Sequence, residues 1–144
     1  MKIEQICVSL ELAKQLKEAG YPQESLFYVD EASKQTTYPN TEFRKIIREV
    51  DGKLTNTEYF SSPTASELLE ELPNYISDTP DGFYLHIAKW HEEIEKEPYQ
   101  CFYKPAKGNV KRAFENFAEF RGNTTQDALA KMWLYLKQNN LLTK

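Results

Sequence analysis

The stretch that most constrains the fold is residues 124–142, which read TTQDALAKMWLYLKQNNLL. A short polar side chain at Asn123 or Thr124 can cap its start, because such a side chain accepts a hydrogen bond from a free N–H of the first turn. Apolar residues then recur at the spacing of one helix face, namely Ala128, Leu129, Met132, Trp133 and Leu136. The sequence therefore predicts a helix over residues 124–139 against which the rest of the fold packs.

Two further apolar residues of this segment, Ala130 and Leu134, lie off that face. An apolar second face is typical of a partner or homodimer surface, so both are candidate interaction residues. Asn140 suits the left-handed residue that follows a last helical turn, and Leu141 can then fold back onto Leu136.

Two shorter helices are predicted by their end signals. Residues 9–19 start at a potential cap, Ser9, and stop at Gly20, where a positive φ is needed. Residues 64–72 open with a T-x-x-E capping box formed by Thr64 and Glu67, and Pro73 ends them.

The segments between these helices predict strands. Aromatic and β-branched residues favour strands over residues 25–29, 54–60, 83–91 and 99–104, and the short apolar residues 1–8 suggest another. Residues 42–50 alternate in polarity, and the Asp51-Gly52 pair that follows is a typical hairpin turn. Residues 110–121 fit a helix or a strand, and we favour a strand over 113–120, because it leads directly into the C-terminal helix.

Together these elements predict one α+β domain over residues 1–144, since this length suits a single domain. Its sheet is expected to be a mainly antiparallel meander with three helices packed on one side. Helices alternate with hairpins and form no βαβ units, which disfavours a parallel sheet.

Composition narrows the class of protein. The net charge of −4 is well spread, which argues against a dedicated nucleic-acid surface. The two cysteines lack metal-ligand spacing and suggest buried thiols in a reducing cytosol. No signal-peptide-like run and no apolar stretch of ~20 residues occurs, so a cytoplasmic protein without a membrane part is expected. No cofactor is expected, because the five glycines are isolated and no calcium loop occurs.

Few residues of the sequence suggest catalysis or metal binding. His86 and His91 lie five apart on one predicted strand and should face opposite ways, which disfavours a metal pair. Cys101 and His86 can face one another if the hairpin over residues 83–104 is regular, giving a nucleophile and a base beside Tyr103. No oxyanion-type turn precedes them, so a buried structural cysteine is favoured over this enzymatic or ligand-binding pocket. The acidic run at residues 92–97 is more typical of a solvated hairpin tip than of a cation site or a nucleic-acid mimic.

Basic and aromatic residues are adjacent at Lys89-Trp90 and Tyr103-Lys104, and at Lys111-Arg112 before Phe114. On a sheet face such pairs can stack single-stranded bases. The neighbouring glutamates oppose this reading, because phosphate contacts dominate the affinity for nucleic acids.

The high aromatic content favours an interaction surface, with nine tyrosines and eight phenylalanines. The leading hypothesis is therefore a non-enzymatic interaction domain that binds another protein or a second copy of itself. Its candidate contacts are Ala130, Leu134, Trp90 and Tyr103.

Three stretches carry a resemblance: residues 9–27 (SLELAKQLKEAGYPQESLF), 63–73 (PTASELLEELP) and 127–142 (DALAKMWLYLKQNNLL). Their order and spacing resemble a family of small uncharacterised proteins of bacterial prophages and phage-like elements. The resemblance implies an accessory protein of a mobile element, acting inside a bacterial cell. It brings no assigned activity and no functional residue.

Overall fold

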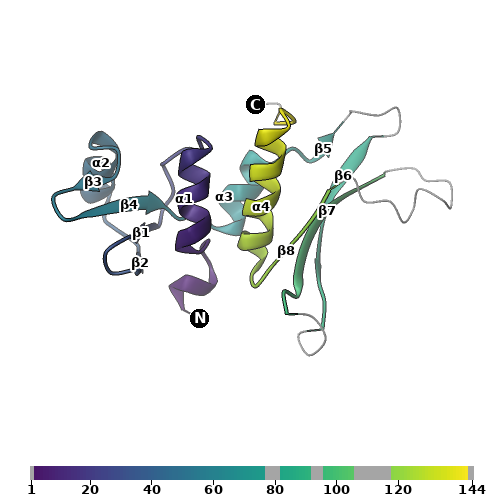
Figure 1. Ribbon diagram of the computed structural model, residues 1–144, viewed down its shortest axis with the longest axis horizontal. Helices are drawn as coiled ribbons and strands as arrows, with labels where there is room; N and C mark the ends of the chain where they lie inside the picture. The colour runs from purple at the N-terminus through teal and green to yellow at the C-terminus, as the bar shows by residue number, and fades with distance from the viewer. Residues whose placement is uncertain (1, 77–81, 92–95, 106–117, 143–144) are drawn as a thin grey trace. The chain divides into compact units, whose positions relative to one another are not determined.

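The computed structural model describes residues 2–76, 82–91, 96–105 and 118–142 and shows an α+β protein (Figure 1). The described chain divides into two compact units, Met1–Glu67 and Leu68–Lys144, each with its own four-stranded antiparallel sheet. The α+β class and the antiparallel pairing are thus confirmed. The expected single meander with three helices is matched only in part, since the three helices are present but the described residues form two sheets and a fourth α-helix. The single-domain prediction stays a prediction, because two such units can belong to one domain.

The first unit contains a short 3-10 helix, two α-helices and the sheet β2-β1-β4-β3. In chain order these are η1 (Ile3–Gln5), α1 (Leu10–Glu18), β1 (Tyr28–Asp30), β2 (Thr36–Thr37), α2 (Thr41–Glu49), β3 (Lys53–Leu54) and β4 (Thr57–Ser61). The strand expected over residues 1–8 is wrong, because η1 occupies its centre and Cys7 forms one isolated bridge with Thr64.

Helix α1 has the ends that its sequence predicts. Ser9 accepts a hydrogen bond from the N–H of Leu12, and Gly20 adopts a φ of 89°. The N–H of Tyr21 then donates to the carbonyl of Leu16 at 2.8 Å, which closes the last turn.

Helix α2 replaces the strand expected over residues 42–50. Asn40 caps it by accepting a hydrogen bond from the N–H of Phe43 at 2.8 Å. Phe43 and the buried Ile47 lie four apart on one helix face, a spacing that the alternating pattern hid. Asp51 and Gly52 do have positive φ angles of 52° and 80°, but they close this helix, with the Gly52 N–H donating to the Ile47 carbonyl. A hairpin turn and a helix end require the same φ angles there.

Helix α3 (Ala65–Glu71) carries the chain into the second unit. Its capping box is confirmed, since the Thr64 N–H donates to Glu67 at 2.8 Å and the Glu67 N–H donates to Thr64 at 3.3 Å.

The second unit is the sheet β5-β6-β7-β8 with helix α4 against it. Its elements are β5 (Tyr75–Ile76), β6 (Phe83–Lys89), β7 (Tyr99–Pro105), β8 (Ala118–Gly122) and α4 (Thr125–Gln138). The hairpin β6–β7 is confirmed, and β8 confirms the strand at the end of residues 110–121. Residues 110–117 lie outside the described ranges.

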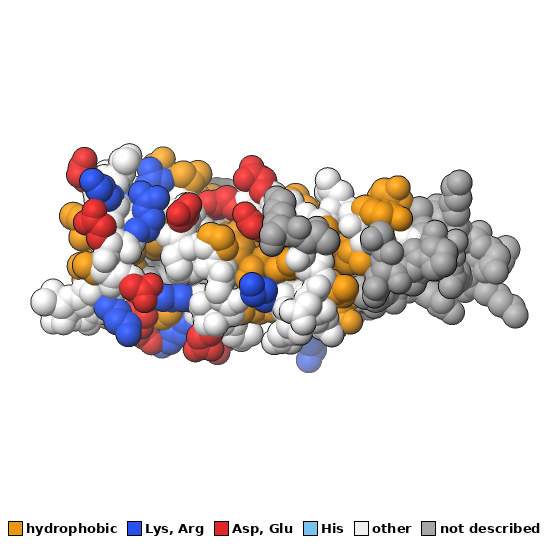
Figure 2. Space-filling model, turned by 90° about the horizontal axis from the view of Figure 1, so that it is seen from above, with side chains coloured by type: hydrophobic (Ala, Val, Ile, Leu, Met, Phe, Trp, Pro, Cys, Tyr) orange, Lys and Arg blue, Asp and Glu red, His pale blue; other side chains and the backbone are white. Residues whose placement is uncertain are grey.

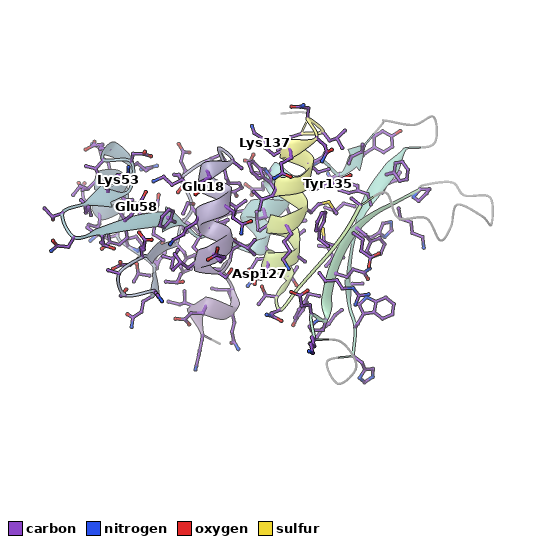
Figure 3. All side chains as sticks on the ribbon, viewed as in Figure 1. Glu18, Lys53, Glu58, Asp127, Tyr135 and Lys137 are labelled. Carbon is purple, nitrogen blue, oxygen red and sulfur yellow. The ribbon has the colours of Figure 1, made fainter. Side chains whose placement is uncertain are left out.

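Helix α4 is the predicted C-terminal helix. Thr124 caps it by accepting a hydrogen bond from the Asp127 N–H, and Asn140 takes a φ of 55° after its last turn. The ring of Tyr135 points from α4 to the sheet and lies 5.4 Å from that of Phe120 (Figure 3). No helix in the described ranges is long and apolar enough to cross a bilayer.

Candidate functional site

The two faces of the second sheet follow from its register. Leu85 pairs with Tyr103, and Cys101 pairs with Phe120, whose ring contacts α4. Because successive side chains of a strand alternate between faces, these residues share the face toward α4. The opposite side, here called the outer face, carries five ring-bearing side chains: Tyr75, Tyr84, His86, Trp90 and Phe102.

The rings of the outer face contact one another across neighbouring strands. The imidazole of His86 stacks on the ring of Phe102, with centroids 5.4 Å apart and planes at 8°. The rings of Tyr75 and Tyr84 lie 5.1 Å apart. Gly82 makes room for them, because a Cβ there would lie 2.0 Å from the Tyr75 ring. The outer face therefore carries two packed ring pairs, Tyr75–Tyr84 and His86–Phe102, in addition to Trp90.

Trp90 is the largest exposed ring of this face, with 51% of its surface accessible. It directly follows β6, and its backbone N–H continues the ladder by donating to the Pro98 carbonyl at 2.7 Å. Its indole N–H donates to the side-chain oxygen of Gln100, which is 4% exposed. The guanidinium of Arg121 lies 6.0 Å from the ring centroid. These contacts hold the indole in one orientation while half of it stays exposed.

Among the described residues, the charged side chains of the outer face are two cations and one carboxylate. Lys104 pairs with Tyr84 in the register, and Arg121 pairs with Gln100. One carboxylate, that of Glu119, lies opposite Phe102 and forms an ion pair with Arg121 at 3.6 Å.

Three of the four candidate interaction residues are buried. Ala130 and Leu134 are 0% and 9% exposed, so α4 presents no exposed second face and this support for an interaction surface is lost. Tyr103 is 0% exposed, and its hydroxyl donates to the Pro73 carbonyl at 2.6 Å. Burial also raises the pKa of Tyr103. Trp90 alone of the four is exposed.

The structure separates Cys101 from His86. Cys101 pairs with Ile87, whereas the adjacent His86 pairs with Phe102, so the two side chains point to opposite faces. Cys101 is fully buried, and burial raises the pKa of its thiol to about 12. The expected facing pair is therefore wrong, because the register turns Cys101 and His86 to opposite faces of the sheet. A thiol that burial keeps protonated is also a poor nucleophile. The described residues include no group of three or more potential metal ligands, and His91 is exposed.

Both thiols should resist alkylation in the folded protein. Burial raises the pKa of Cys7, like that of Cys101, to about 12, and both are at most 1% exposed. Because the thiolate is the nucleophile, we expect almost no reaction with iodoacetamide near pH 8 and complete reaction in guanidinium, measured by intact mass. Rapid labelling of the native protein at Cys101 would contradict the placement of this thiol.

The aromatic and basic pairs of the sequence divide between the two faces. Lys89 lies 5.2 Å from the ring centroid of Tyr99, on the side toward α4, and Tyr103 is buried. Lys111, Arg112 and Phe114 lie outside the described residues, as do residues 92–95 of the acidic run. Figure 2 shows Lys and Arg interspersed with Asp and Glu over the first unit. The described aromatic and basic pairs therefore do not lie together on one face of the sheet.

The sequence did not assign four rings of the outer face to an interaction surface: Tyr75, Tyr84, Phe102 and His86, the last of which was considered only as a base or metal ligand. The signal for two of them was present, since Tyr84 and His86 lie six and four residues before Trp90, and even spacings put side chains on one face of a strand. Comparison with family models, with curated proteins and with solved structures gives no match to this chain.

Proposed function

We propose that this chain is a non-enzymatic interaction domain whose outer face binds a partner protein. The observation that supports the proposal most is the exposure of three rings on one sheet face, at 41% for Tyr75, 47% for Tyr84 and 51% for Trp90. Clustered exposed apolar groups are typical of interaction sites, and Trp, Tyr and Arg dominate the binding energy of protein interfaces.

The contacts among these rings favour binding further. Ordering a side chain on association costs conformational entropy, and a side chain that is already held costs less. The indole of Trp90 is fixed by Gln100 and Arg121, and His86 is stacked on Phe102. Such a surface can bind a partner with little rearrangement.

The charges indicate what kind of partner fits. Lys104 and Arg121 share the outer face with one carboxylate, that of Glu119, so the described part of this face has a positive balance. Complementary charge steers association and selects partners. The partner is expected to present apolar side chains rimmed by Asp and Glu.

The cellular context is part of the same proposal. The resemblance of residues 9–27, 63–73 and 127–142 to prophage proteins supports an accessory protein of a mobile element in the bacterial cytoplasm. The separation of Cys101 from His86 favours binding over catalysis.

Affinity capture from host cells during induction of the element tests the outer face. The Tyr84→Ala/Trp90→Ala double variant should lose a stoichiometric partner that the wild type recovers after nuclease treatment. The Ile46→Ala variant is the matched control, because Ile46 is 44% exposed but lies on α2 in the first unit. It should recover the partner normally.

The other outcomes separate the competing readings. Equal recovery by the double variant contradicts the outer face as the binding surface. Recovery that nuclease abolishes favours nucleic-acid binding instead. Self-association in sedimentation velocity that the double variant loses identifies the partner as a second copy of the chain.

A further inference from the structure

The first unit contains a pocket with a cavity volume of about 200 Å³. Its walls come from α1, β1, α2 and β4 and from the turn that follows α2. The residues of these walls include Lys17, Tyr28, Ile47, Arg48, Gly52 and Tyr59. All of these residues belong to Met1–Glu67, so the pocket lies within one compact unit and is separate from the outer face.

The apolar part of the pocket is well packed. Ile47 and Tyr28 are 2% and 1% exposed, and the Tyr59 ring packs edge-on against Phe43 at 5.7 Å. The Tyr28 hydroxyl donates to the Gln23 carbonyl at 2.7 Å, which fixes its ring. Burial raises the pKa of Tyr28, so the hydroxyl stays neutral. A cavity of about 150 Å³ can hold benzene, so this pocket has room for a ring-sized apolar group.

Two cations line the same pocket and differ in their hydrogen-bond and ion-pair partners. Lys17 donates to the Asp51 carbonyl at 2.6 Å and to the carboxylate of Glu58 at 3.1 Å (Glu58 is labelled in Figure 3). The side chain of Arg48, on the exposed last turn of α2, has no hydrogen bond or ion pair with any described residue. A guanidinium presents a planar pair of donors that matches a carboxylate, so Arg48 is available for an anionic group.

The charges around the pocket disfavour a ligand with more than one negative charge. Glu24 and Asp51 also line the pocket and offset the two cations Lys17 and Arg48, and Glu58 adds a further negative charge beside Lys17. A doubly charged phosphate would be repelled by these carboxylates more strongly than a singly charged group would. A single carboxylate therefore suits the pocket better.

Gly52 is a point of close approach in the pocket wall. A Cβ at this position would lie 2.4 Å from the Tyr59 carbonyl oxygen and 3.1 Å from the Lys17 Nζ. The absence of a side chain therefore lets α2, β4 and Lys17 meet closely at the pocket wall.

We propose that this pocket binds a small organic monocarboxylate with a ring-sized apolar group. The carboxylate pairs with the guanidinium of Arg48, and the ring lies against Ile47, Tyr28 and Tyr59. This site is a ligand-binding function in addition to the proposed protein interaction, and neither depends on the other.

Titration of the full chain with benzoate, followed by amide chemical shifts, tests the proposal. Saturable shifts are expected at Ile47 and Gly52, with binding weakened roughly tenfold or more in Arg48→Ala, because a charge-assisted bond is lost. The control Lys45→Ala, on an exposed part of α2, should bind as the wild type does. Arg48→Lys should bind with intermediate affinity, since an ammonium keeps the charge without the fork.

Two further probes examine the class of ligand. Benzamide, which has the same ring without the charge, should bind more weakly than benzoate, and inorganic phosphate should not shift these amides. Absence of saturable benzoate shifts, equal affinity in a folded Arg48→Ala, or tighter binding of phosphate or benzamide than of benzoate would overturn the proposal.

Discussion

Replacing Leu129 by alanine should lower the free energy of unfolding by about 2–5 kcal/mol. Leu129 is 0% exposed on α4, among the buried residues of the face that its sequence predicts. The loss combines the transfer of the deleted methyl groups to water with the cavity that they leave. It should appear in urea denaturation as a lower midpoint with an unchanged slope.

The control for this change lies on the same helix. Lys137 is exposed near the end of α4, so Lys137→Ala should change the free energy of unfolding by no more than about 0.5 kcal/mol. Equal effects of the two substitutions would show that α4 does not bury the face containing Leu129.

Replacing Gly52 by alanine should destabilise the protein by about 2–5 kcal/mol, through two separate causes. Its φ of 80° costs about 1–2 kcal/mol for a residue with a Cβ. That Cβ would also lie 2.4 Å from the carbonyl oxygen of Tyr59, and backbone must shift to relieve such a contact, at about 1–3 kcal/mol.

Gly20→Ala is a matched control that isolates the second cause. Gly20 has a φ of 89°, but a Cβ there meets nothing within 4 Å. Gly20→Ala should therefore be destabilised by the backbone strain alone, which costs about 1–2 kcal/mol. If thermal or urea unfolding gives the same loss for both alanine variants, the close approach of Gly52 to Tyr59 is incorrect.

Helix ends were predictable because they depend on a few local groups. Gly20 and Asn140 needed a positive φ, and the Thr64–Glu67 box needed two side chains three residues apart. These interactions act within one turn, so residue types and spacing suffice to find them.

The error at α2 has a physical origin in the same local rules. Residues 42–50 satisfy an alternating pattern and a helical one together, and Asp51-Gly52 suits a hairpin or a helix end. The choice between them depends on the burial of Ile47, which the rest of the unit provides. Local sequence does not contain that information.

The candidate sites depend on tertiary pairing in the same way. The register that puts Cys101 opposite Ile87 decides that Cys101 and His86 face apart, and it gathers the rings of the outer face. Ala130 and Leu134 looked available because they lie off the main face of one helix, yet the folded chain covers both. The pocket around Arg48 had no sequence signal, since its lining residues are scattered from Lys17 to Tyr59.

The most direct test of the outer face is the dissociation constant of the captured partner, measured by calorimetry for purified wild-type, Trp90→Ala and Ile46→Ala proteins. Truncating a central aromatic anchor typically costs about 2 kcal/mol or more, so Trp90→Ala should weaken binding by roughly 30-fold or more. Ile46→Ala should leave the constant unchanged. Equal constants for the wild type and a folded Trp90→Ala protein would contradict a binding surface centred on Trp90.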